Sequence, residues 1–181
     1  MWVRHRDLEP QEMALAQAVF GKAFPFGWRI VVTDLCGLGG TCFVCPGLGR
    51  QILVNLGGRT FAQPMYCGSS TYHAPGKLLV HELAHAWQIA HGHYYPRLWR
   101  RLLAGPNAGD AFYRPPPSLS PPWAALNLEQ QATVVDEWFA PGRLGPDGWA
   151  GSPGMSPHHP YWDYVRAVIR DEHGGVSDDL G

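Results

Sequence analysis

The chain has 181 residues, which is enough for one domain with a hydrophobic core and short of what two ordinary domains need. Apolar residues make up 45% of it and charged residues 16%, a composition typical of globular rather than disordered proteins. The formal net charge is -1, so no basic field would attract nucleic acid or anionic lipid, and we expect neither as a partner. The apolar runs are too short to span a bilayer, which predicts no membrane insertion.

The N-terminal segment, MWVRHRDLEPQEMALAQ, carries charges and lacks the apolar core of a signal peptide. We therefore expect a cytoplasmic protein by default, with export by a system that needs no cleaved signal as the alternative. Glycine (22) and proline (17) are abundant, so loops should take up much of the backbone.

Helix and strand patterns predict one α+β domain over residues 1–181, with strands early and helices later. The segment 76–90 has apolar residues nearly all round its first turns and should be a buried helix. The helix 127–139 begins with Asn127 as cap and Gln130 three residues later, as in a capping box. In chain order we expect a helix (7–21), a strand (28–35), a glycine-rich turn region (36–49), a strand (50–57), a short edge strand within 63–73, the helix 76–90, a proline-rich extended stretch (114–123), the helix 127–139, a loop (142–160) and an amphipathic helix (161–175).

The sequence HELAH at residues 81–85 has the form HExxH and lies within the expected buried helix. Two histidines four residues apart project from one face of a helix, about one turn apart, so both imidazoles can reach a single Zn²⁺. The glutamate between them can take a proton from water at the zinc and later give it to a leaving amine. We therefore predict one catalytic Zn²⁺ on His81 and His85, with Glu82 as general base.

A catalytic zinc needs a third protein ligand, and His91 stands where the extended pattern HExxHxxGxxH has its third histidine. That pattern uses a glycine to break the helix, whereas this chain has Gln88 at the matching position. On an unbroken helix His91 would lie about 8 Å or more beyond His85 along the axis, because each residue rises about 1.5 Å. We therefore expect His91 not to bind the metal.

Glu129 is the expected third ligand, because it lies on the second strong helix, which can return antiparallel to the first. Glu129, Ala132 and Asp136 share one face of that helix, and the small side chain of Ala132 lies where the two helices must approach each other. Asp136 is expected to accept a hydrogen bond from the other ring nitrogen of a ligand histidine and so to fix its tautomer. Asp136 and Glu137 are the alternatives to Glu129 as the ligand.

The segment HELAHAWQ (81–88), followed downstream by NLEQQA (127–132), resembles the gluzincin branch of the zinc metallopeptidases. More narrowly, it is similar to small bacterial zincin-like proteins associated with Rhs and Vgr elements of type VI secretion systems, which pair HExxHxWQ with NxEQQA. The opening RDLEPQEMALAQAVFG also resembles this group. The resemblance therefore covers most of the chain, apart from the cysteine-rich loop and the stretch RPPPSLSPP. The resemblance implies a zincin-like fold, in which a small, mostly antiparallel sheet packs on a buried HExxH helix and a second ligand-bearing helix. It also implies His81, His85 and Glu129 as ligands and Glu82 as general base.

An amide-hydrolysing site usually has a donor for the developing oxyanion, often a tyrosine or a histidine from elsewhere in the chain. Tyr113, His158, His159 and Tyr161 are candidates, although no spacing singles one out. We retain His159 and Tyr161 as the expected catalytic donors.

Four cysteines, Cys36, Cys42, Cys45 and Cys67, leave three alternatives open. They could form a structural zinc site, since Cys42 and Cys45 make a CxxC pair. They could form disulfides, which would suit an exported protein. They could also be free buried thiols, the ordinary state in a cytosolic chain.

Two functions compete on this evidence. The first is a zinc metallopeptidase that hydrolyses a peptide or protein substrate, either as a secreted effector, with a secretion-system component or an immunity protein as partner, or as a processing protease. The second is a catalytically inactive zincin-fold adaptor or chaperone of a bacterial secretion apparatus. Glu82 favours the peptidase, because a purely structural zinc site needs no general base, whereas the lack of an obvious oxyanion donor favours the adaptor.

Overall fold

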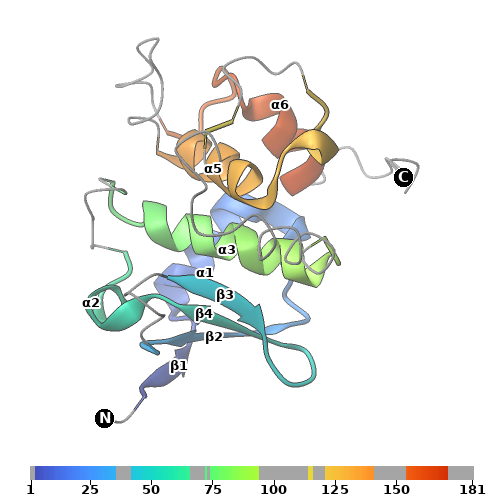
Figure 1. Ribbon diagram of the computed structural model, residues 1–181. Helices are drawn as coiled ribbons and strands as arrows, with labels where there is room; N and C mark the ends of the chain where they lie inside the picture. The colour runs from blue at the N-terminus through green and yellow to red at the C-terminus, as the bar shows by residue number, and fades with distance from the viewer. Residues whose placement is uncertain are drawn as a thin grey trace.

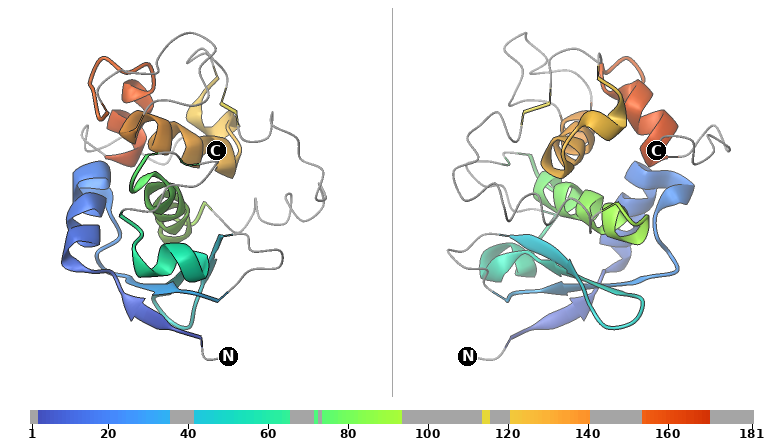
Figure 2. Two further views of the ribbon diagram at one scale, coloured as in Figure 1. Left: turned by 90° about the vertical axis from the view of Figure 1, so that its left-hand side faces the viewer. Right: turned by 45° about the vertical axis from the view of Figure 1, so that its right-hand side comes forward.

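Three layers make up the part of the chain that the computed structural model describes, which is residues 3–35, 42–65, 72, 74–93, 114–115, 121–140 and 154–170 (Figure 1). A four-stranded sheet forms the first layer. Helices α1 (Pro10–Phe20) and α3 (Lys77–Ala90) lie side by side on one face of the sheet, and α5 (Leu128–Phe139) and α6 (Trp162–Tyr164) lie beyond them (Figures 1 and 2). Helix α3 is thus the middle of a sandwich between the sheet and α5.

The sheet has the strand order β1-β2-β4-β3, with β1 at His5–Asp7, β2 at Arg29–Thr33, β3 at Phe43–Pro46 and β4 at Gln51–Asn55. The outer pairs β1/β2 and β3/β4 are antiparallel, and the central pair β2/β4 is parallel. The sheet is therefore mixed, and the α+β class predicted from the sequence is confirmed. Its register aligns Val32, Val54 and Val44 across three strands, and these buried side chains belong to the hydrophobic core.

Helix α3 is buried along its whole length from Lys77 to Ile89, as its apolar composition predicted. The helix begins after Gly76, which has a φ of +76°, a conformation that suits glycine. A side chain there would also meet Leu15 and Phe139, because a Cβ would lie 3.5 Å from one and 3.6 Å from the other. The start of α3 is therefore packed closely against both α1 and α5.

Helix α5 begins with the predicted capping box. The backbone N–H of Gln130 donates to Asn127 Oδ1 at 2.9 Å, and the backbone N–H of Asn127 donates to Gln130 Oε1 at 3.0 Å. These bonds satisfy backbone groups that the first turn of a helix leaves without partners, so they fix where α5 starts.

The structure differs from the sequence-based prediction at four places. Strand β1 and the short helix α2 (Gly57–Ala62) were not expected, because three and six residues are too few to show a periodicity. Strand β3 lies in the segment predicted as a turn, because its four residues stand among glycines and are too few to indicate a strand. The predicted last helix is α-helical only over α6 and continues as a π-helix, η5 (Val165–Ile169). So short an apolar pattern cannot distinguish the pitch of an α-helix from that of a π-helix.

The edge strand expected within 63–73 falls mostly on residues outside the described ones, as does the end of the last helix beyond residue 170. None of the described helices is long and apolar enough to cross a membrane.

A buried ion pair ties β1 to the start of α1. The carboxylate of Glu12 is 0% exposed and accepts two bonds from the Arg6 guanidinium, at 2.6 and 2.7 Å, and one from the backbone N–H of Glu9 at 2.8 Å. Arg6 also donates to the backbone oxygen of Phe61 in α2 at 3.2 Å. One guanidinium thus holds together a strand and two helices.

Replacing Arg6 by methionine should lower the free energy of unfolding by about 3 kcal/mol, because it leaves the buried Glu12 charge without its counter-ion. Arg4 is the control: its guanidinium also lies over the Phe61 ring, but its side chain is 57% exposed, and its partner Asp34 also accepts a hydrogen bond from the backbone N–H of residue 4, which a substitution keeps. Arg4→Met should cost clearly less than Arg6→Met. Urea unfolding of both variants measures this difference, and equal losses would contradict the role given to Glu12.

Candidate metal centre

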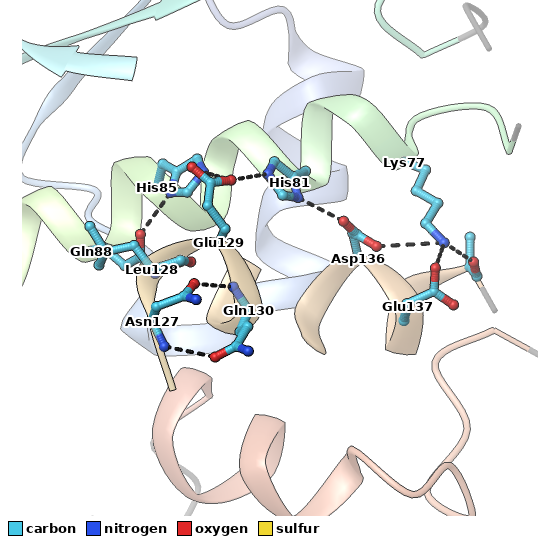
Figure 3. A network of polar contacts seen from close by, with 11 residues as sticks. Lys77, His81, His85, Gln88, Asn127, Leu128, Glu129, Gln130, Asp136 and Glu137 are labelled. Carbon is cyan, nitrogen blue, oxygen red and sulfur yellow. Dashed lines mark hydrogen bonds and ion pairs between the residues drawn. The ribbon is translucent and has the colours of Figure 1, made fainter. Parts of the chain in front are cut away.

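A row of buried polar side chains runs along the interface between α3 and α5 (Figure 3). The residues on α3 are four, four and three positions apart, which places them on one face of the helix. The row consists of Lys77, His81, His85 and Gln88 on α3 and of Glu129, Gln131, Asp136 and Glu137 on α5.

Three of these side chains converge on one point. The Nε2 atoms of His81 and His85 lie 3.3 and 3.4 Å from the same oxygen, Oε2 of Glu129. One ligand atom from each residue lies within 4.8 Å of the others, and all three residues are buried. The arrangement joins the three residues that the sequence predicted as metal ligands, and it could hold a metal ion.

The ring orientation of His81 is set by Asp136. The Nδ1 atom of His81 lies 2.7 Å from Asp136 Oδ2. An ionised carboxylate only accepts hydrogen bonds, so Nδ1 carries the proton and Nε2 faces Glu129. The predicted contact between Asp136 and a ligand histidine is therefore present.

The ring orientation of His85 is set by a different group, the side-chain amide of Gln88. The nitrogen Nε2 of Gln88 donates to the backbone oxygen of Leu128 and to Gln131 Oε1, both at 3.0 Å. The amide oxygen of Gln88 is thereby left facing His85 Nδ1 at 2.8 Å. Because this oxygen can only accept, His85 also carries its proton on Nδ1 and turns Nε2 toward Glu129.

The side-chain amides of Gln88 and Gln131 form an amide relay to His85, and Gln131 fixes the direction in which both amides point. Gln131 Nε2 donates to the backbone oxygens of Trp123 at 3.0 Å and Leu126 at 3.4 Å. Since carbonyl oxygens cannot donate, the other end of the Gln131 amide must be the oxygen that accepts from Gln88. The tautomer of His85 is therefore set by the backbone carbonyls of Trp123 and Leu126, which act through Gln131 and then through Gln88.

The donor set needs a cation. Two imidazole lone pairs and a carboxylate oxygen that point at one buried spot repel each other unless a positive charge lies among them. Burial lowers the pKa of His81, but hydrogen bonds to Asp136 and Glu129 outweigh it and raise this pKa to about 10. Burial raises the pKa of Glu129, but the charges and hydrogen bonds of His85 and His81 hold it well below its usual range. Protons or a metal ion can meet this need, and the donors fit a metal ion.

Glu82 lies near the ligands and near the edge of the sheet. It is buried, and its charge helps to raise the pKa of His81. Burial, and then the charge of Glu82, raise the pKa of the Cys42 thiol to about 11. Cys42 directly precedes β3, the last strand in the sheet order, and its Sγ donates to the backbone oxygen of Leu56. Helix α3, which carries Glu82, packs against β3, the last strand of the described sheet.

His91 does not join the metal-binding group, in agreement with the prediction from helix geometry. Gln88 continues α3 instead of breaking it, and His91 follows the end of the helix. The Nδ1 atom of His91 bonds the backbone oxygen of Trp87 at 2.9 Å, and its ring stacks on the Trp87 indole with centroids 4.3 Å apart.

His159 and Tyr161, the predicted oxyanion donors, lie near the other end of the polar row. Burial and then the charge of Lys77 lower the pKa of His159 to about 4. Burial and then the charges of Glu137 and Asp136 raise the pKa of Tyr161. The backbone N–H of Tyr161 donates to His159 Nδ1 at 3.1 Å. Their role in stabilising an oxyanion stays a prediction.

Of the four cysteines, the structure describes two. Cys42 and Cys45 are free thiols, and Cys45 lies within β3, opposite Leu53. The extended backbone from Phe43 onward lacks the turn that brings the two thiols of a zinc-binding CxxC together. Cys36 and Cys67, like the oxyanion candidate Tyr113, fall outside the described residues.

The sequence pattern assigned no role in the site to Lys77, Gln88 and Gln131, which belong to the row, or to Tyr72, which lies beside it. Tyr72 lies beside His81, with ring centroids 5.3 Å apart. One signal was available for Lys77 and Gln88. They stand four residues before His81 and three after His85, on the same face of a helix that is otherwise mostly apolar.

No protein-family model, curated protein or solved structure matches this chain. A metal centre is therefore inferred from the geometry of the chain's own side chains.

Gln88→Leu should change the tautomer of His85, because it removes the only acceptor described here for the Nδ1 proton. In the metal-free protein, two-bond ¹⁵N–¹H correlation spectra of the neutral imidazole should show His85 protonated on Nδ1 in wild type. The variant should show a substantial Nε2-protonated fraction. Gln130 is a glutamine of α5 that bonds Asn127 instead, so Gln130→Leu should leave the tautomer of His85 unchanged. An Nε2-protonated His85 in wild type would contradict the relay.

His159 should remain neutral in the folded protein until the pH approaches 4, because its Nδ1 accepts a backbone hydrogen bond and its pKa is lowered. The unfolded chain takes up this proton from about pH 6.5 downward. The contribution of His159 to stability is therefore present above that pH and is lost as the pH falls toward 4. The free energy of unfolding of wild type should thus fall, relative to His159→Asn, across this window. An NMR signal of His159 that titrates near pH 6.5 would disprove it.

Proposed function

We propose that this chain is a zinc-dependent metallopeptidase. The observation that carries the proposal is the convergence of His81 Nε2, His85 Nε2 and the Glu129 carboxylate at one buried point. Two imidazoles and one carboxylate form the donor set of many catalytic zinc sites, and Glu82 stands between the histidines in sequence, as in zinc peptidases. The resemblance to gluzincins supports the same function.

In this proposal each residue of the site has one task. Bound Zn²⁺ supplies Lewis acidity toward the scissile carbonyl and the attacking water. Glu82 takes the proton from that water and returns it to the leaving amine. Asp136 and Gln88 keep the Nε2 atoms of the two histidines available by holding a proton on each Nδ1.

The substrate is proposed to bind as an extended chain along β3. This strand is the last in the sheet order, and it packs against α3, which carries Glu82. An edge strand offers backbone N–H and C=O groups to which another chain can add. Pro46 has no N–H, so the usable stretch is short. A secretion-system component or an immunity protein as partner stays a prediction from the resemblance.

The test combines metal content with hydrolysis of an unfolded protein substrate. Purified wild type should contain about one zinc per chain. Glu129→Gln should lose it under mild chelation, because an amide oxygen is a weaker ligand than a carboxylate. Glu82→Gln should keep the zinc and lose about 10²-fold or more in hydrolysis rate, because the general base is gone.

Three outcomes would contradict the proposal. Zinc retained in Glu129→Gln would exclude Glu129 as the third ligand and leave Asp136 or Glu137 in its place. Full zinc occupancy with equal activity in wild type and Glu82→Gln would exclude Glu82 as the general base. Full zinc occupancy with no activity in either protein would favour the non-catalytic adaptor.

A further inference from the structure

Lys77 is a buried cation at one end of the polar row. It is the first residue of α3 and only 4% exposed. Its ammonium bonds the carboxylate of Glu137, donates to the backbone oxygen of Ala140 at 2.9 Å, and lies 3.5 Å from Asp136 Oδ1. Burying an ammonium is costly, and a pair of apolar residues in the place of Lys77 and Glu137 would often serve stability equally well.

Asp136 lies between this ammonium and a metal ligand (Figure 3). Its Oδ1 faces Lys77 at 3.5 Å, and its Oδ2 faces His81 Nδ1 at 2.7 Å. The Lys77 ammonium therefore holds Oδ1 and the His81 N–H holds Oδ2, and the two groups together fix the plane of the carboxylate. Lys77 and His81 are four residues apart on α3, so one carboxylate on α5 can reach both.

We propose that Lys77 is a positioning residue of the metal centre: it holds Asp136 in the orientation that directs His81 Nε2 toward the metal. The contacts of Lys77 are with Glu137, Ala140 and Asp136 and not with the ligand atoms, so it acts on His81 through Asp136. This inference extends the proposed function, but its first test needs no metal.

A purely structural role is the competing explanation, because Lys77 also joins the start of α3 to the end of α5 through Glu137 and Ala140. The two explanations differ in which carboxylate matters. Positioning depends on the contact with Asp136, whereas a structural link depends mainly on Glu137 and Ala140.

The experiment compares Glu137→Gln with the double variant Lys77→Met/Glu137→Gln. The single variant breaks the ion pair and keeps Lys77 beside Asp136. The double variant removes both charges of the pair, so no buried charge of that pair is left alone and the fold should survive. Lys77→Met alone is avoided, because it would leave Glu137 buried without its counter-ion.

The first measurement is the ¹H–¹⁵N resonance of His81 Nδ1–H in the metal-free proteins. Wild type and Glu137→Gln should both show a slowly exchanging proton hydrogen-bonded to Asp136. In the double variant this resonance should shift or broaden. The second measurement is zinc affinity by chelator competition, which should weaken about 10- to 100-fold in the double variant and in Asp136→Asn, but not in Glu137→Gln. Adding Lys77→Met/Glu137→Gln to Asp136→Asn should cause no further loss.

A wild-type resonance and wild-type affinity in the double variant would overturn the proposal and leave Lys77 as a structural link. Equal losses in the single and the double variant would do the same. If no form of the protein binds zinc, the proposed peptidase function fails, while the resonance of His81 still decides whether Lys77 positions the ring.

Discussion

The buried interface between α3 and α5 imposes one condition on everything in it: each polar group needs a partner, because water cannot supply one. The chain meets this condition with two unlike arrangements at the two histidines. His81 donates to a carboxylate that is held by an ammonium, and His85 donates to an amide that is held by backbone carbonyls. Both arrangements end in the same result, a pair of Nε2 atoms directed at Glu129. The geometry of the candidate metal site is thus a consequence of satisfying hydrogen bonds on the far sides of the rings.

The rest of the fold serves to keep this interface closed. Helix α3 could not be buried on two sides without apolar residues against the sheet, and the aligned valines of β2, β4 and β3 provide the surface on which it packs. The close contact of Gly76 with α1 and α5 holds the beginning of the helix, and the capping box of Asn127 fixes the beginning of its neighbour. Both helices are therefore anchored at the ends that determine how the ligands align.

Sequence alone was sufficient for those parts of the site that depend on spacing along one helix. The positions of His81 and His85, the exclusion of His91 and the shared face of Glu129 and Asp136 all follow from the helical repeat. It was not sufficient for contacts that depend on how far one helix is shifted along the other. Whether Lys77 meets Asp136, or Gln88 meets Gln131, is decided by that shift, which no local pattern encodes. The same limit applies to β3, whose few strand residues become recognisable only when β4 lies beside them.

The amide relay has a consequence for how this sequence can change over generations. Gln88 and Gln131 each use both ends of the amide, so replacing either one leaves the other with an unsatisfied buried group. The two positions should therefore vary together or not at all. Trp123 and Leu126 contribute only backbone oxygens to the relay, so their side chains are free of this hydrogen-bonding restriction. Among related chains, the pair of glutamines would be inherited as a unit, while its backbone acceptors would tolerate substitution subject only to packing.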